Sequence, residues 1–412
     1  MTKMRTSFSV RALAVALTVI MIFSAMVTVF NANAASWPTR GSSATTSVAG
    51  GGKGKWATTN GTISVNGTNA LSVNYRNQKV GYAVYLPENY EEYANNADGK
   101  KLAVMLVMSG GTDELNAKYY YMANTTGLNY LADEKGIILV YVRQNNYIIN
   151  TAYAWTWWQP SDYTRNTTSG YVPQRVTELV KSIQTQYGDY VDTDRTYVTG
   201  LSAGACMAAT FAALYPDVYA GAAIVGGTPF KCVTVNPIST KRIMFAYTYA
   251  YSYQHAYNAM HYGTGGITET PYEFEKDVNV LGKYITEAWA AAGVSAEDAT
   301  RVAIFHGTAD ETIRIQNGRN IANANAIARF GNTDTTATEA RTGYTAFFYG
   351  TDSKMVAEGY SNDRASAIAL YEVDDVEHVW VSANSTGDWC QKSDVYDYNE
   401  MMWEFFEGSN VE

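Results

Sequence analysis

The stretch that most constrains the fold is Gly200-Leu201-Ser202-Ala203-Gly204, a Gly-x-Ser-x-Gly pattern. A short β-branched and aromatic run precedes it at 195–198, and an Ala-rich stretch typical of a helix follows at 206–214. Strand, Gly-x-Ser-x-Gly and helix in that order predict a tight turn that exposes the serine Oγ at the edge of a sheet. The alternative is a glycine-rich loop with an incidental serine, but the flanking elements favour a nucleophile at Ser202.

The first 34 residues have the features of a secretory signal peptide. Three basic residues precede an apolar run at 12–30, and residues 32–34 read Ala-Asn-Ala, a small-x-small cleavage site. The run is nearly long enough to act as an uncleaved membrane anchor, but the Ala-rich ending favours cleavage. We therefore expect residues 35–412 to be exported to the extracellular space, with no membrane attachment after cleavage.

Charge and cysteine content exclude several classes of protein. The formal net charge is −9 and no basic cluster is present, which argues against nucleic acid and anionic membranes as partners. The three cysteines, Cys206, Cys232 and Cys390, have no metal-type spacing and are too few for a disulfide scaffold. A Cys206–Cys232 bridge and a buried free thiol at Cys206 both remain open. We expect no metal and no cofactor.

The rest of the chain alternates predicted strands with predicted helices. Continuous apolar runs are typical of parallel strands buried on both faces, and they lie at 102–108, 136–142, 219–225, 301–305 and 366–373. Helices are expected between them, at 119–134, 172–187, 317–329 and 395–406. Alternating patterns predict a hairpin of 63–65 with 71–75 and a strand at 80–86. The expected fold is α/β, a mostly parallel sheet with antiparallel edge strands and helices on both faces.

The domain organisation is predicted to be simple. Residues 35–70 are rich in Ser, Thr, Gly and Asn and are expected to form a flexible lead-in. Residues 71–412 are expected to form one catalytic domain. Within it, 230–299 is expected to be a long insertion or lid that contains a helix at 273–292.

A serine nucleophile needs a base, and the chain has four histidines: His255, His261, His306 and His378. In a fold with this strand, serine turn and helix, the catalytic residues follow along the chain in the order Ser, acid, His, so the base should follow the last strand. His378 fits that place. His306 is better explained as ordering the loop of the acid, and the other two as surface or substrate-channel groups.

Asp310 is the predicted orienting acid. It follows the strand at 301–305, so its carboxylate should lie at the same sheet edge as the serine. Glu311 is the nearest competitor, and Asp374 and Asp375 are weaker ones. The alternative for Asp310 is capping of the turn that follows it.

Two further groups of residues are candidates for the site. The N–H of Ala203 is a predicted oxyanion donor, and a second donor is expected from Ser109 or Gly110, after the first buried strand. Trp155 and Trp157 are candidates for substrate binding, although two of the three tryptophans at 155, 157 and 158 could equally be core residues.

Several segments together resemble the esterases of the polyhydroxybutyrate depolymerase family, relatives of secreted feruloyl and acetyl-xylan esterases. They lie at 127–133, 154–157, 197–204, 215–219, 227–229 and 305–313. The resemblance implies an α/β-hydrolase fold and maps the nucleophile to Ser202, the acid to Asp310 and the base to His378. Two motifs depart from the family: Ser109-Gly110 replaces His-Gly, and Glu377 replaces the Gly before the histidine.

The expected function is a secreted serine esterase that works through an acyl-enzyme. Its partner is expected to be an ester-bearing polymer or oligomer: a short-chain polyester such as poly(3-hydroxybutyrate), or plant polysaccharide with feruloyl or acetyl esters. A peptidase of the same fold and a non-catalytic glycan-binding protein are the alternatives.

Overall fold

The computed structural model describes residues 51–57, 61–65, 78–95, 99–111, 121–144, 155, 157–158, 160–165, 171–233, 255–262, 274–351 and 366–407. Its strands are β1 (Lys55–Trp56), β2 (Gly61–Val65), β3 (Gln78–Leu86), β4 (Leu102–Met108), β5 (Ile137–Gln144), β6 (Val191–Leu201), β7 (Gly221–Val225), β8 (Arg301–Gly307), β9 (Thr335–Arg341), β10 (Tyr344–Tyr349), β11 (Ile368–Val373), β12 (Trp380–Ser382) and β13 (Cys390–Lys392). Its α-helices are α3 (Tyr121–Thr125), α4 (Leu128–Lys135), α5 (Val172–Gln186), α6 (Ala203–Leu214), α8 (Val278–Ala292), α9 (Gln316–Phe330) and α11 (Tyr398–Glu407).

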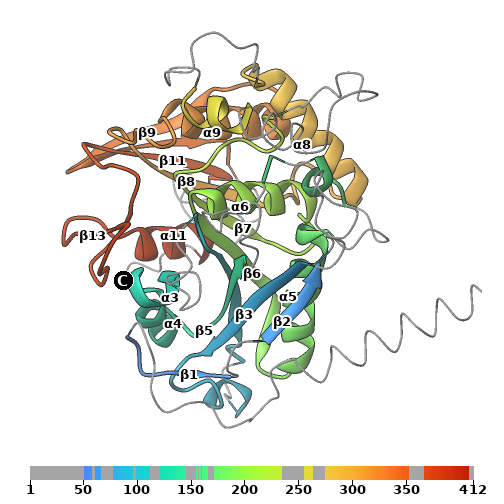
Figure 1. Cartoon of the computed structure of the whole chain (residues 1–412), viewed down its shortest axis with the longest axis vertical. Helices are drawn as coiled ribbons and strands as arrows, with labels where there is room; N and C mark the ends of the chain where they lie inside the picture. Colours follow the sequence, from blue (N-terminus) through green and yellow to red (C-terminus); the bar gives the residue numbers. More distant parts are fainter. Residues whose placement is uncertain are drawn as a thin grey trace, which may run out of the picture.

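An eleven-stranded sheet forms the centre of the molecule, in the order β1-β3-β5-β4-β6-β7-β8-β11-β10-β9, with β2 paired to β3 (Figure 1). The six strands from β5 to β11 are parallel. Every residue of β4 is buried, as its unbroken apolar sequence predicts for a strand covered on both faces. The predicted fold class is therefore confirmed, including antiparallel strands at the edge.

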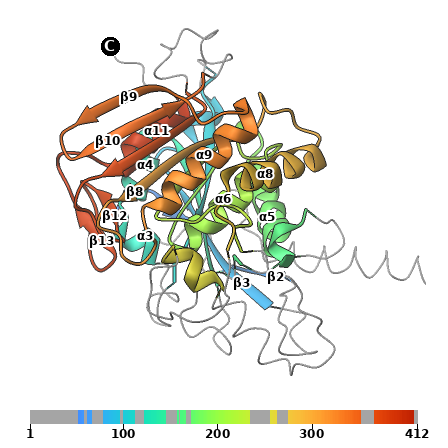
Figure 2. The same cartoon turned by 90° about the horizontal axis from the view of Figure 1, so that it is seen from above.

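Helices cover the sheet on both faces. Helices α5, α6, α8 and α9 lie on one face, and α3, α4 and α11 lie on the other (Figures 1 and 2). Each side has its own apolar core cluster, and the strands contribute alternate residues to the two clusters. Because the central strands are parallel, all their carboxyl ends lie at one edge of the sheet.

Two details differ from the sequence-based expectation, and a third lies partly outside the described residues. The helix expected at 119–134 is two helices, α3 and α4, and Gly127 between them has φ 75°, a left-handed conformation that interrupts a helix. The strand β2 pairs antiparallel with β3; the expected partner at 71–75 lies outside the described residues. The sheet also has a second antiparallel edge, the β9–β10 hairpin, which the sequence pattern did not predict.

Part of the expected insertion at 230–299 is a regular element of the fold. Helix α8 packs against α6 and α9, on the chain between the neighbouring parallel strands β7 and β8. Residues 234–254 and 263–273 lie outside the described residues, as do 1–50, which include the predicted signal peptide. No helix in the described part of the chain is both long enough and apolar enough to span a bilayer.

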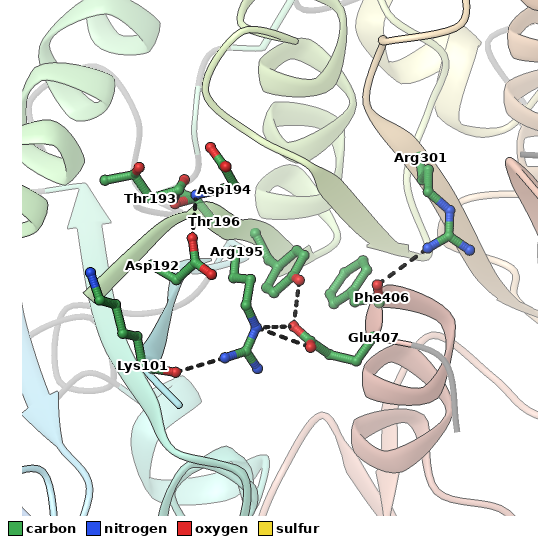
Figure 3. A network of polar contacts seen from close by, with 10 residues as sticks. Lys101, Asp192, Thr193, Asp194, Arg195, Thr196, Arg301, Phe406 and Glu407 are labelled. Atoms are coloured by element: carbon green, nitrogen blue, oxygen red, sulfur yellow. Dashed lines mark hydrogen bonds and ion pairs between the residues drawn. The ribbon is translucent and has the colours of Figure 1, made fainter. Parts of the chain in front are cut away.

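Helix α11 is tied to the middle of β6 by a polar network (Figure 3). Arg195 Nε donates to both carboxylate oxygens of Glu407, at 2.8 and 3.0 Å, and Tyr197 Oη donates to the same carboxylate. The Tyr197 ring stacks on Phe406 with 4.4 Å between centroids. Arg301 Nη1 also donates to the Phe406 carbonyl, at 3.2 Å. These contacts hold α11 against the sheet.

Candidate active site

Ser202 stands at the turn between β6 and α6 with φ 59° and ψ −122°. A positive φ is strained for a residue with a side chain, and it is the expected geometry of a nucleophile elbow. The Ser202 N–H donates to the Val225 carbonyl at 3.0 Å, which fixes the turn to the end of β7. The side chain is half-buried while both neighbours in the chain are buried, so the turn presents this hydroxyl at the carboxyl edge of the sheet.

The glycines on either side of the serine are required by close backbone approach. A Cβ added at Gly200 would lie 2.5 Å from the Gly204 carbonyl carbon, and one added at Gly204 would overlap the Met108 carbonyl oxygen. Real Cβ atoms do not approach other atoms this closely. The Gly-x-Ser-x-Gly pattern therefore has a steric cause in this fold.

Asp310 and His378 are brought together at the same edge. His378 Nδ1 lies 2.6 Å from Asp310 Oδ2, and both side chains are buried. Asp310 Oδ1 accepts from the N–H groups of Thr312 and Ile313 at 2.9 and 2.8 Å. Because an ionised carboxylate can only accept, Nδ1 of His378 carries the proton and its Nε2 presents a lone pair. Among the described residues, His378 Nε2 has no hydrogen-bond partner.

Gly226 connects the serine with this pair. It follows Val225, which holds the Ser202 N–H, and a Cβ added to it would lie 3.1 Å from His378 Cε1 and 3.3 Å from Asp310 Oδ2. The strands β6, β7, β8 and β11 are consecutive in the sheet, and Ser202, Gly226, Asp310 and His378 follow them in that order. No hydrogen bond joins Ser202 Oγ to His378 in this structure; such bonds are often long before substrate binds.

The carboxylate of Asp310 is held in its charged form. Burial alone would raise its pKa, but the hydrogen bond and charge of His378, the His306 ring and the Ile313 N–H outweigh burial, so the pKa is lowered. A permanently ionised carboxylate is what an orienting acid requires.

His306 lies near the end of β8, and its ring contacts the loop that carries the acid. Its Nε2 is 2.6 Å from the Ile313 carbonyl oxygen and 3.6 Å from Asp310 Oδ2. A carbonyl only accepts, so Nε2 carries the proton of the neutral ring. The contact closes the turn that brings the Ile313 N–H to Asp310.

Of the candidate donors for the oxyanion, the Gly110 N–H already makes a hydrogen bond within the protein. Ala203 is the first residue of α6, so its N–H lies at the positive end of the helix dipole. Gly110 lies against the nucleophile, since a Cβ added to it would be 3.2 Å from Ser202 Cβ. Its N–H, however, donates to the Tyr121 hydroxyl at 2.8 Å. Ser109 is buried beside Gly204. Sequence reasoning gave no signal for Tyr121.

The remaining candidates are two tryptophans and two histidines. Trp155 and Trp157 are 1% and 3% exposed and belong to the core cluster that contains α5 and α6, which leaves them little surface for a ligand. His261 stacks on Tyr257 at 4.0 Å, and His255 is buried at the start of the same short helical segment, 255–260.

The cysteines are free thiols in this structure. Cys206 and Cys232 are buried, and the Thr228 hydroxyl donates to Cys206 Sγ at 3.2 Å. Burial raises the pKa of Cys206 to about 12, so its thiol stays protonated. No group of three or more His, Cys, Asp or Glu side chains suited to a metal ion occurs in the described ranges.

Comparison with known proteins agrees with the motifs. Residues 73–248, which contain Ser202, match the family model of the esterase PHB depolymerases. Poly(3-hydroxyalkanoate) depolymerase C of Paucimonas lemoignei is 32% identical over 149 residues, 36% of this chain and 34% of that protein. Feruloyl esterase B of Talaromyces funiculosus is 26% identical over 274 residues, 64% of this chain and 65% of that protein. The chain thus spans between one third and two thirds of these relatives.

The fold has a counterpart among solved structures. Acetyl xylan esterase from Aspergillus awamori superposes with a TM-score of 0.54 at 19% identity, over 85% of this chain and 100% of that one. At this identity the likeness concerns the fold. The predicted resemblance is therefore confirmed: in sequence the chain resembles the esterases of the polyhydroxybutyrate depolymerase family, and it has the α/β-hydrolase type of fold.

Proposed function

We propose that the protein is an exported serine esterase that hydrolyses carboxylic esters through an acyl-enzyme. The observation that carries the proposal is the 2.6 Å contact of Asp310 with His378, beside a serine held in a strained elbow. The esterase names of the relatives support the same reaction class.

In this proposal each residue has one step. Ser202 Oγ attacks the ester carbonyl carbon while its proton passes to His378 Nε2, and the carbonyl electron pair moves onto the oxygen. The tetrahedral intermediate collapses, the C–O bond to the alcohol breaks, and the alcohol takes the proton from Nε2. Water then repeats the sequence on the acyl-enzyme and releases the acid. Asp310 stays ionised and stabilises the imidazolium.

The substrate is proposed to be an ester-bearing polymer. Curated relatives are named for poly(3-hydroxyalkanoate), feruloyl and acetylxylan substrates, so short-chain polyesters and esterified plant polysaccharide are the two candidate classes. An acidic chain with a predicted signal peptide is consistent with action outside the cell.

Covalent labelling tests the nucleophile. A fluorophosphonate reacts only with an activated serine, so it should label the peptide that contains Ser202, and Ser202→Ala should abolish labelling. Labelling elsewhere, or none with an intact fold by circular dichroism, would contradict the proposal. Acid release from feruloylated xylan, acetylated xylan and poly(3-hydroxybutyrate) then assigns the substrate class.

A further inference from the structure

The Tyr121 hydroxyl contacts the loop that faces the nucleophile. It accepts the Gly110 N–H at 2.8 Å, and the Tyr121 side chain is 5% exposed at the start of α3. This contact withdraws the Gly110 amide from other acceptors. In this structure Gly110 therefore does not offer a free N–H to an oxyanion.

The hydroxyl keeps its own proton available. A tyrosine hydroxyl both accepts and donates, and the bond from Gly110 uses only its acceptor side. Across the described ranges, the structure gives no acceptor for the Tyr121 proton. Burial raises the pKa of the phenol, outweighing the opposite effect of the Gly110 N–H, so the group stays protonated. A buried donor without an acceptor is costly, and such groups call for an explanation.

The distance to the nucleophile suits a donor. A Cβ added at Gly110 would lie 2.8 Å from Tyr121 Oη and 3.2 Å from Ser202 Cβ, so these two atoms are at most 6.0 Å apart. In a tetrahedral adduct the oxyanion lies about 3 Å from the serine Cβ, and its donors lie about 2.7–3.1 Å beyond it. The two spans add to about 6 Å, so a hydroxyl at most 6.0 Å from Ser202 Cβ is within reach of an oxyanion at this serine.

We propose that the Tyr121 hydroxyl, together with the Ala203 N–H, donates a hydrogen bond to the oxyanion of the intermediate, in place of the Gly110 amide. The inference rests on the proposed esterase function. Tyr121 keeps its proton throughout, so no covalent step is added. The bond accepted from Gly110 polarises the hydroxyl and strengthens it as a donor.

Tyr121→Phe tests the proposal against a matched control. Tyr141 lies on β5, and Tyr141→Phe also removes one buried tyrosine hydroxyl. That hydroxyl donates to Asn129 Oδ1 at 2.8 Å. For p-nitrophenyl acetate, Tyr121→Phe should lower kcat by roughly 10²–10³ with little change in KM. Inhibition by a trifluoromethyl ketone, which forms an anionic hemiketal with the serine, should weaken by a similar factor. Tyr141→Phe should retain both values.

Two outcomes overturn the inference. If Tyr121→Phe keeps or raises kcat, the Gly110 N–H that the change releases is the donor. If kcat falls while ketone inhibition is unchanged, Tyr121 only positions the loop. Absence of turnover in the wild-type protein would instead contradict the proposed function. Should Tyr121→Phe fail to fold, 3-fluorotyrosine at 121 retains the packing with a more acidic hydroxyl; kcat should then rise, and an unchanged kcat contradicts the proposal.

Discussion

His378 Nδ1 lies 2.6 Å from Asp310 Oδ2 although the two residues are 68 positions apart in the sequence. Their loops are joined by backbone as well: Thr308 N donates to Val373 O at 2.8 Å, and Ala309 N donates to Val376 O at 3.1 Å. The pair is thus fixed by neighbouring parallel strands, β8 and β11, rather than by the two side chains alone. This preorganisation is what a base and its orienting acid need.

Asp310→Asn should remove the charge that orients and stabilises the imidazolium. Because the amide holds His378 in the wrong tautomer, we expect kcat to fall by roughly 10³–10⁴ with KM little changed. Glu311→Gln is the matched control, since Glu311 is the adjacent carboxylate and its side chain is 84% exposed. Steady-state kinetics on p-nitrophenyl acetate measures both. Equal losses in the two variants would contradict the assignment of the acid.

Gly226→Ala should separate activity from stability. The added Cβ would lie 3.1 Å from the His378 ring, and φ is +58°, so the variant should displace the histidine and lose most of its kcat. Gly331→Ala has a similar strain at φ +74° but no atom within 4 Å. Each should lose about 1–2 kcal/mol of unfolding free energy, but only Gly226→Ala should lose activity. Retained activity in Gly226→Ala would show that the contact is unimportant.

His306 should make stability depend on pH below neutrality. Burial, only partly opposed by the Asp310 charge and the Ile313 carbonyl, lowers the pKa of His306 from 6.5. The unfolded chain therefore takes up a proton that the folded chain does not, and stability is lost as pH falls below about 6.5. The slope for one such group is about 1.4 kcal/mol per pH unit.

Urea unfolding at pH 6.5 and 5.5 checks this dependence. His306→Gln retains a donor for Ile313 O without a titrating ring, so it should lose less stability over the same interval than wild type. The same slope in both proteins would exclude His306 as the source. Asp310, whose pKa is lowered from 3.8, contributes stability that is lost only below about pH 3.8, so the two windows are separate.

Glu407→Gln should weaken the attachment of α11 to the sheet without changing catalysis. The carboxylate accepts from Arg195 and Tyr197 in a partly buried network, so we expect a loss of about 1–3 kcal/mol in unfolding free energy. Glu287→Gln is the comparison: its pair with Lys283 is 3.9 Å long and exposed, so its loss should stay within about 0.5 kcal/mol. Kinetics should be unchanged in both, and a fall in kcat for Glu407→Gln would link the network to the site.

Much of the sheet could be predicted because buried parallel strands leave a simple signal. The apolar run at 102–108 coincides with β4, and the run at 301–305 lies within β8. The β9–β10 hairpin was missed because β9, with the sequence TTATEAR, has polar residues on both faces and only part-buried or exposed side chains. The alternation of apolar and polar residues that predicts a half-buried strand is therefore absent from β9.

The candidate site, like the sheet, was predicted only in part. Scarcity of histidine and the order of strands indicated the Asp310–His378 pair, which the structure brings into contact. Contacts between side chains and loop backbone, such as Gly110 with Tyr121, have no sequence pattern because the tertiary fold creates them. The sequence also does not show whether a tryptophan lies in the core or lines a binding site. In the structure, Trp155 and Trp157 are buried.

The most direct test of the account is hydrolysis of p-nitrophenyl acetate and butyrate by residues 35–412, beside the Ser202→Ala variant. Turnover by the wild-type sequence and its loss by roughly 10⁴-fold or more in the variant, with unchanged circular dichroism, is the predicted result. Equal turnover in both proteins, or none in a folded wild type, would contradict a serine esterase centred on Ser202.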